Sequence, residues 1–373
     1  MFHSVRKAAS FAILNDMSSS LESSREVLDT VCGVLASHAA EVDETDAWPA
    51  AQLRLLGDSG LFSWFTAEEL GGDQWPETDL IEAYIALARS CLTTTFILTQ
   101  RQGAMSRIAA SENESLRSAL LPDLLTGKTF ATLGISHLTT SRRYLGRPAM
   151  RAAEKGDGYV LDGESPWVTG AAHAQHVILG ATLDDGRQML VALPNDAPGV
   201  STPAWEKLIA LSASHTGRLV CERVAVSAKW VLAGPSDNLL QAGRGTRTGG
   251  LQTSALALGV ASAAIELMRK EAQQRAHLEL PQRGLWEEWD TLRADLLNKA
   301  QDCDSATADE LRSRANSLVL RATQAALAAA KGTGFVRGHP AGRWCREALF
   351  FLVWSCPQNV LAANLCEFAG LEA

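Results

Sequence analysis

Four short runs of strand-forming residues decide the fold of this chain: Tyr159-Val-Leu161, Val177-Ile-Leu179, Met189-Leu-Val-Ala-Leu193 and Arg218-Leu-Val-Cys221. Two dipeptides that are typical of hairpin turns punctuate them: Asp157-Gly158 directly precedes the first run, and Asp185-Gly186 lies between the second and the third. Short β-prone runs separated by such turns favour neighbouring antiparallel strands. We therefore expect an antiparallel, barrel-like β-domain over residues 129–235.

Helical periodicity flanks this domain on both sides. Over residues 21–128, apolar residues recur at spacings of three and four, and Pro76-Glu-Thr-Asp-Leu80 has the composition of a helix start. Over residues 236–373, two alanine-rich stripes predict longer helices: Leu251, Ala255, Leu258, Ala261, Ile265, Met268 and Ala272, then Leu311, Ala315, Leu318, Ala322, Ala325 and Ala329. Asp304 or Ser305 is expected to cap the second of these helices and Gly332 to end it.

The expected class is therefore α+β and mainly α, with an N-terminal helical domain, a middle β-domain and a C-terminal four-helix bundle. Residues 1–20 are predicted to be a loose extension, because Met1 to Asn15 lacks the continuous apolar segment of a secretory signal.

Composition narrows the function classes. The chain has 373 residues, 46% of them hydrophobic, and a formal net charge of −8, which disfavours a nucleic-acid partner. The sequence shows no apolar run near the roughly 20 residues that span a bilayer, so no membrane partner is expected. Seven scattered cysteines without a CxxC spacing predict free thiols in a cytoplasmic protein, and no metal site.

The order of four N-terminal segments is similar to that of the acyl-CoA dehydrogenase family: Ala47-Trp-Pro49, Gly60-Leu-Phe62, Glu68-Glu-Leu-Gly-Gly72 and Leu121-Pro-Asp-Leu-Leu-Thr-Gly127. The resemblance runs from about Glu22 to Ala373. It implies the same domain order, FAD as the cofactor, an acyl-CoA-like small-molecule substrate, and a homodimer or homotetramer. The sequence identifies no electron acceptor.

The resemblance also assigns a flavin-binding segment. Trp167-Val-Thr-Gly170 looks like the family's W-(I/V)-T segment, which implies that Trp167 covers one face of the isoalloxazine and that Thr169 approaches its N5 atom. Upstream, Ile135 to Arg143 stands in place of the family's flavin loop. Ser136, Thr139 and Ser141 are the candidate cofactor contacts there, and Arg142 and Arg143 suit a phosphate or carboxylate.

The C-terminal helices are expected to complete the dinucleotide site. Arg275 aligns with a family arginine that reaches the pyrophosphate of a neighbouring subunit's FAD. Lys331-Gly-Thr-Gly-Phe335 resembles the family's "GGxGY" turn, where Gly332 and Gly334 allow backbone contact with the adenosine half. Arg346-Glu347 corresponds to the family's "RD" and is assigned a structural role.

The family's catalytic carboxylate has no counterpart in this reading. Most relatives place a Glu four residues before a Gln in the tail, and counting back from Gln358 gives Trp354. A minority place it on the first bundle helix, where Gly249 and Gly250 stand here. Removal of the substrate's α-proton would then lack its usual base.

Three functions remain open from the sequence. The first is an FAD-dependent oxidoreductase acting on an acyl thioester or related small substrate without the usual base. The second is a flavin-dependent monooxygenase or oxidase of the same superfamily, for which His137 is the catalytic candidate. The third is a redox-inactive homologue that binds a flavin or another ligand.

Overall fold

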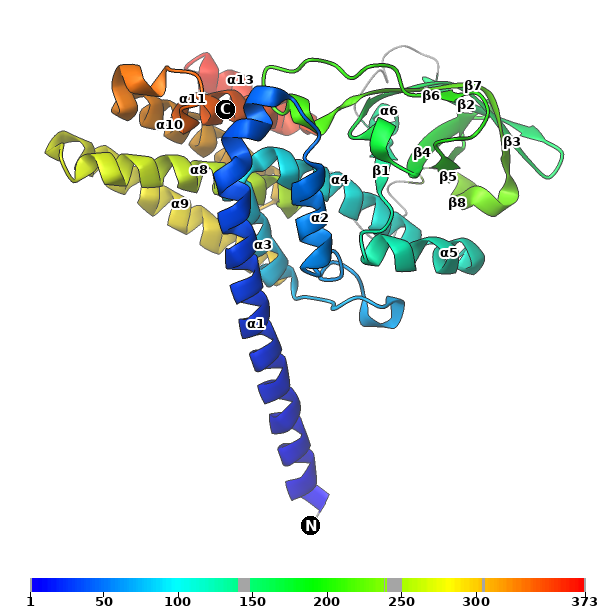
Figure 1. The fold of residues 1–373 in the computed structure, drawn as a ribbon, viewed down its shortest axis with the longest axis horizontal. Coiled ribbons are helices and arrows are strands. Elements are labelled where there is room, and N and C mark those ends of the chain that lie inside the picture. The colour runs from blue at the N-terminus through cyan, green and yellow to red at the C-terminus, as the bar shows by residue number, and fades with distance from the viewer. Residues whose placement is uncertain (1, 140–147, 238, 240–249, 304–305, 372–373) are drawn as a thin grey trace.

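The computed structural model describes residues 2–139, 148–237, 239, 250–303 and 306–371, with side chains from residue 24 onward. Figure 1 shows the arrangement, with the sheet on one side, the C-terminal helices on the other and the N-terminal helices between them. The expected order of helical domain, β-domain and helical domain is confirmed.

The N-terminal helices form the centre of the molecule: α1 (Phe2–Thr45), α2 (Ala50–Asp58), α3 (Glu77–Ser90), α4 (Leu92–Ala109) and α5 (Glu114–Leu125), with a short 3-10 turn at Glu68–Leu70. Pro76 precedes the first residue of α3, as the sequence indicated. Residues 2–20, expected as a loose extension, instead continue α1 as helix, and this part of α1 projects away from the body (Figure 1).

The middle domain is one eight-stranded sheet: β1 (Ala131–Gly134), β2 (Met150–Lys155), β3 (Gly158–Val168), β4 (His176–Leu183), β5 (Gln188–Pro194), β6 (Val200–Ser201), β7 (Gly217–Ser227) and β8 (Val231–Ser236). A one-turn helix, α6 (Ser136–Thr139), follows β1. All four runs predicted as strands lie in β3, β4, β5 and β7, and both predicted turns join hairpins.

The sheet differs from the expectation in one respect. It is mixed rather than antiparallel, because β4 pairs in parallel with both β1 and β2. Turn dipeptides predict only hairpins between strands that follow each other in the sequence. The parallel pairings instead join strands from separate parts of the chain. The strand order runs β6-β7-β3-β2-β4-β5-β8, so β6 and β8 are the edge strands of the path.

The C-terminal region comprises α8 (Leu251–Ala272), α9 (Glu279–Ala300), α10 (Ala308–Gly334), α11 (Pro340–Ala348), α12 (Phe350–Val353) and α13 (Gln358–Phe368). Thr307 caps α10 through a capping box with Glu310. The cap was predicted at Asp304 or Ser305, which lie outside the described residues. Gly332 was predicted to end this helix, and the backbone does leave helical geometry one residue earlier, at Lys331, before resuming to Gly334.

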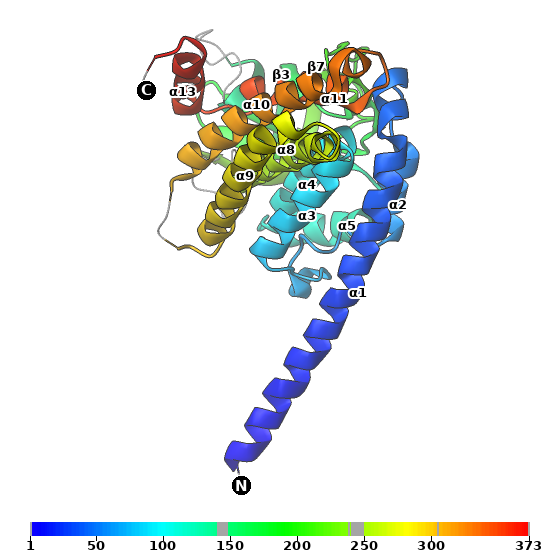
Figure 2. The same cartoon turned by 90° about the vertical axis from the view of Figure 1, so that its left-hand side faces the viewer.

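Helix α8 is the centre of the largest core. It packs against α9 and α10 and also against α3, so the N-terminal domain supplies one wall of the predicted bundle (Figure 2). Its length and mean hydropathy of 1.4 would suit a membrane span, but 72% of that apolar window is buried within the protein. Core packing therefore accounts for its apolar composition.

Gly259 on α8 permits the close approach of α3. A Cβ added there would lie 2.5 Å from the carbonyl oxygen of Ile85 and 2.8 Å from Cβ of Ala88. Gly284, on α9, has no such neighbour within 4 Å. The two glycines therefore form a matched pair for testing this contact.

We predict that Gly259→Ala lowers the free energy of unfolding by about 1–3 kcal/mol, because the methyl group must push α8 away from the backbone of α3. Gly284→Ala should instead raise it by about 0.5–1 kcal/mol through helix propensity. Chemical denaturation of both variants provides the measurement. Equal behaviour of the two variants would contradict the packing described here.

Candidate functional site

The turn Trp167–Gly170 at the end of β3 combines an exposed ring with a rigid backbone. The pairing of β3 with β7 shifts register between Ser165 and Val168, and Trp167 has a φ of 58°. The indole is 46% exposed although its neighbours Val168 and Thr169 are buried. The ordered backbone of the turn therefore holds the Trp167 indole partly exposed to solvent, a position that suits stacking of a planar ligand.

Thr169 is fixed in this turn by three hydroxyl groups. Its carbonyl oxygen accepts a hydrogen bond from Thr132 Oγ1 (2.7 Å), and its own Oγ1 lies 3.0 Å from Thr216 Oγ1. Ser214 Oγ lies a further 2.8 Å from Thr216 Oγ1. The hydroxyl of Thr169 therefore points into the β-domain, which leaves its backbone as the part that a ligand beside Trp167 would approach.

The Ser136-His137 segment contacts the residues of β3 that directly precede the same turn. Ser136 Oγ donates to the carbonyl oxygen of Pro166 (2.8 Å), directly before Trp167. His137 is buried, with Nε2 2.9 Å from the carbonyl oxygen of Gly180 and Nδ1 3.2 Å from Ser165 Oγ. Because a carbonyl oxygen only accepts, Nε2 carries the proton and Nδ1 is left to accept from the serine.

In this arrangement both ring nitrogens of His137 face protein groups. Action on a substrate would require the ring to leave these partners, and the catalytic assignment of His137 stays a prediction. The side chain of Thr139, and residues Ser141, Arg142 and Arg143 entirely, lie outside the described part of the chain.

The glycine turn after α10 presents an open surface. Lys331 has a φ of 55°, a Cβ added at Gly332 would have no neighbour within 4 Å, and Phe335 is 86% exposed. Gly334, by contrast, packs against Ala330 and Leu327. Arg275, three residues after the end of α8, forms an ion pair with Glu271 of that helix. Its predicted reach into a neighbouring subunit is untested by a single chain.

Trp354, the tail residue that the family resemblance aligns with the usual catalytic carboxylate, lies among aromatic rings. Trp354 stacks on Phe350 (centroids 5.6 Å apart) and meets Phe96 of α4 edge-on at 4.6 Å. Arg312 Nη2 donates to the carbonyl oxygens of Phe351 (3.0 Å) and Trp354 (3.2 Å). Burial lowers the pKa of Arg312 to about 10, and these carbonyl contacts tie α10 to the tail.

Arg346 and Glu347 occupy structural positions on α11. Arg346 pairs with Asp43 of α1 (3.0 Å) and donates to the carbonyl oxygen of Ile209 (3.1 Å). Glu347 is buried 3.5 Å from Arg343, and its burial raises the pKa of its carboxyl group above the ordinary value. The contacts of Arg346 join α11 to α1 and to the segment that holds Ile209, whereas the Arg343–Glu347 pair lies within α11.

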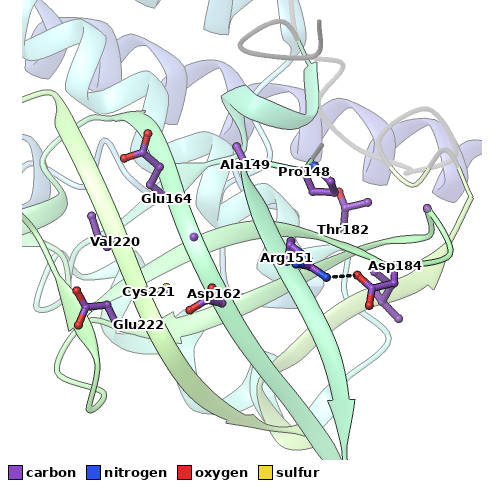
Figure 3. A pocket seen from close by; sticks show the side chains of 13 residues that line it. Pro148, Ala149, Arg151, Asp162, Glu164, Thr182, Asp184, Val220, Cys221 and Glu222 are labelled. Atoms are coloured by element: carbon purple, nitrogen blue, oxygen red, sulfur yellow. Dashed lines mark hydrogen bonds and ion pairs between the residues drawn. The ribbon is translucent and has the colours of Figure 1, made fainter. Parts of the chain in front are cut away.

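A pocket of about 810 Å³ lies on the sheet beside β2, β3, β4 and β7 (Figure 3). Among the described residues that line it are four carboxylates, Asp162, Glu164, Asp184 and Glu222, and one cation, Arg151, which pairs with Asp184 at 2.7 Å. Glu164 precedes Trp167 by three residues on β3. The sequence analysis missed this pocket, although the acidic alternation of Asp162 and Glu164 on one strand was visible.

A second feature missed from the sequence lies behind the turn. A Cβ added at Gly170, whose φ is 63°, would come within 2.5 Å of the Trp48 indole. Trp48 in turn stacks on His173 with centroids 4.1 Å apart. The N-terminal Ala47-Trp-Pro49 segment therefore supports the predicted flavin turn directly.

Comparisons with known proteins agree with this architecture. Residues 21–128 match the family model for the acyl-CoA dehydrogenase N-terminal domain. The chain is 27% identical over 254 residues to a probable acyl-CoA dehydrogenase of Bacillus subtilis, an alignment that spans 66% of this chain and 66% of that protein. It is 24% identical over 336 residues to the mitochondrial short-chain specific acyl-CoA dehydrogenase of Homo sapiens, covering 83% of this chain and 80% of the relative.

A solved structure shows the same fold over nearly the whole length. The glutaryl-CoA dehydrogenase from Mycobacterium smegmatis, solved in complex with FADH2, has a TM-score of 0.79 at 18% sequence identity and covers 94% of this chain and 95% of its own.

Proposed function

We propose that the chain is a member of the acyl-CoA dehydrogenase family and an FAD-linked oxidoreductase that acts on an acyl thioester or a related small substrate, a proposal that the family-model match over residues 21–128 and the similarity to acyl-CoA dehydrogenases support. The observation that carries this proposal is the exposed Trp167 indole beside the rigid Thr169 backbone. Bound FAD would supply hydride acceptance there, and Trp167 would stack on the flavin and exclude water from it. The open Gly332 turn would suit the adenosine half.

We predict that the purified protein carries FAD and that Trp167→Ala weakens flavin binding about tenfold, as loss of an aromatic stacking partner worth up to about 1.5 kcal/mol implies. Titration of the apoprotein, followed by the visible flavin spectrum, gives the affinity. Trp286→Ala, which removes a comparably exposed indole from α9, is the matched control. A protein without saturable uptake of FAD or FMN would favour the redox-inactive reading.

We infer further that Trp354 occupies the place of the usual base. The rings of Phe96 and Phe350 and the Arg312 contacts support this, because together they hold a bulky apolar group in the tail.

Straight-chain acyl-CoAs should therefore reduce the flavin slowly, because general-base assistance is typically worth 10²–10⁴-fold. Stopped-flow bleaching of the flavin measures this rate. Trp354→Glu should accelerate it, whereas Trp354→Leu, which opens the same space without a carboxylate, should not. Wild-type turnover within the usual range of roughly 1–10³ per second would mean that another carboxylate serves as base.

Oxygen consumption with an external flavin reductase, abolished in His137→Ala with flavin retained, would favour the monooxygenase alternative.

We also propose that two or four copies associate through the C-terminal helices. The supporting observation is a set of strongly exposed apolar side chains on α10, α12 and α13 and the segments that follow them: Phe335, Val336, Val353, Leu365, Phe368 and Leu371. Apolar surface of this kind is commonly covered by a partner, and most soluble oligomers consist of identical chains.

Light scattering at micromolar concentration should accordingly report a dimer or tetramer of the 40.0 kDa chain. Paired substitutions Val353→Asp and Phe368→Asp should shift the particle toward the monomer, because each places a charge in the apolar surface. Val34→Asp, at a partly exposed position of α1, is the control. A monomeric wild type with flavin fully bound would exclude this assembly.

A further inference from the structure

Four rings from distant parts of the chain form a continuous stack behind the Trp167–Gly170 turn. Trp48 stacks on His173 (4.1 Å, 12° between the planes), and Trp205 stacks on His215 (3.5 Å, 10°). The two imidazoles join the halves of the stack, with His173 Nε2 2.8 Å from His215 Nδ1. His215 is buried, whereas His173 is partly accessible.

The hydrogen bonds determine where the protons lie. His215 Nε2 is 2.9 Å from the carbonyl oxygen of Asp46, which only accepts, so Nε2 carries a proton. In neutral His215, Nδ1 must then accept, and His173 Nε2 must donate to it. A second proton on His215 would set two N–H groups against each other. The remaining position for an extra proton is Nδ1 of His173, where its addition breaks neither hydrogen bond.

Backbone hydrogen bonds connect the segments that carry His173 and His215 to the Trp167–Gly170 turn. The Gly170 amide donates to the carbonyl oxygens of Ser214 (3.0 Å) and His215 (3.2 Å), and the His173 amide donates to the carbonyl oxygen of Gly170 (3.0 Å). The Trp48 ring covers Gly170 so closely that no side chain fits there. A charge on His173 would therefore lie directly behind the turn, with Trp48 holding the ring in place.

The charged groups near the two histidines interact with other charged residues or with solvent. Asp46 and Lys207 lie 3.8 Å apart, Asp43 pairs with Arg346, and Glu206 is exposed to solvent. The hydrogen bonds of the two imidazoles run to each other and to a backbone carbonyl oxygen. Burial, with a smaller contribution from His215, lowers the pKa of His173 below its ordinary value of 6.5.

We propose that His173 is a positioning residue for the Trp167–Gly170 turn that takes up one proton on Nδ1, and that this proton favours the reduced form of the flavin bound there. The inference rests on the flavin function proposed above. The charge acts because reduced flavin can carry negative charge, which a cation behind the turn stabilises. His215, whose Nε2 donates to the carbonyl oxygen of Asp46, holds the ring of His173 in place.

The direct test follows the midpoint potential of the bound flavin against pH. His173→Gln retains a donor toward His215 but cannot titrate, and His277→Gln, at an exposed histidine, is the control. Wild type and His277→Gln should show a more positive potential than His173→Gln at acid pH, and all three should coincide above pH 7. Identical curves for wild type and His173→Gln at all pH values would overturn the proposal.

A second measurement needs no cofactor. Nitrogen NMR of the histidine rings in the wild-type apoprotein should show a proton on Nε2 of His215 and the addition of a proton at Nδ1 of His173 as pH falls. Because the pKa of His173 is lowered by folding, its contribution to stability is present above pH 6.5 and is lost on acidification. His173→Gln should therefore lose less stability than wild type below pH 6.5.

The outcomes separate the two proposals. Protonation of His215 before His173 would overturn the inferred proton position whether or not flavin binds. Titration of His173 as described, in a protein that binds no flavin, would support the pair as a proton site and contradict the flavin function instead.

Discussion

The contact between α8 and α3 at Gly259 is the constraint on which the rest of the structure depends. It brings backbone within about van der Waals distance of backbone, and it merges the N-terminal and C-terminal helices into one core that extends from Leu35 of α1 to Phe351 of α12. Because α4 follows α3 after a single residue, fixing α3 also fixes Phe96. The tail and α4 therefore meet at Trp354 as a consequence of helix packing far from the sheet.

Much of the fold could be predicted because its signals are local. The strands in β3, β4, β5 and β7 follow from β-prone runs and turn dipeptides, and α8 and α10 from alanine-rich stripes. The parallel pairings of β4 with β1 and β2 were missed because they depend on packing between segments that no turn connects. The α10 cap was misplaced by two or three residues, since Thr307 competes with Asp304 and Ser305 as an equally suitable capping residue.

The site was predicted less completely for the same reason. The segment that contains Trp167 could be identified from the sequence, and the structure places the indole of this residue at the surface. His173, His215 and Asp46 could not, because their hydrogen bonds join residues 42 and 169 positions apart. For His137 the sequence identified the loop position, and its catalytic role stays a prediction, but the hydrogen-bond partner that the structure supplies for each ring nitrogen could not be foreseen.

Backbone strain gathers around the same turn. Trp167, Leu211 and His215 all have positive φ without being glycine, and each such residue costs on the order of 1–3 kcal/mol unless its surroundings hold it. The surroundings here are the ring stack, the Gly170 amide and the hydroxyl group of Thr132. The ring contacts reach into the N-terminal domain through Trp48, and His215 reaches it through the carbonyl oxygen of Asp46. The geometry of the turn is therefore a property of the interface between the two domains.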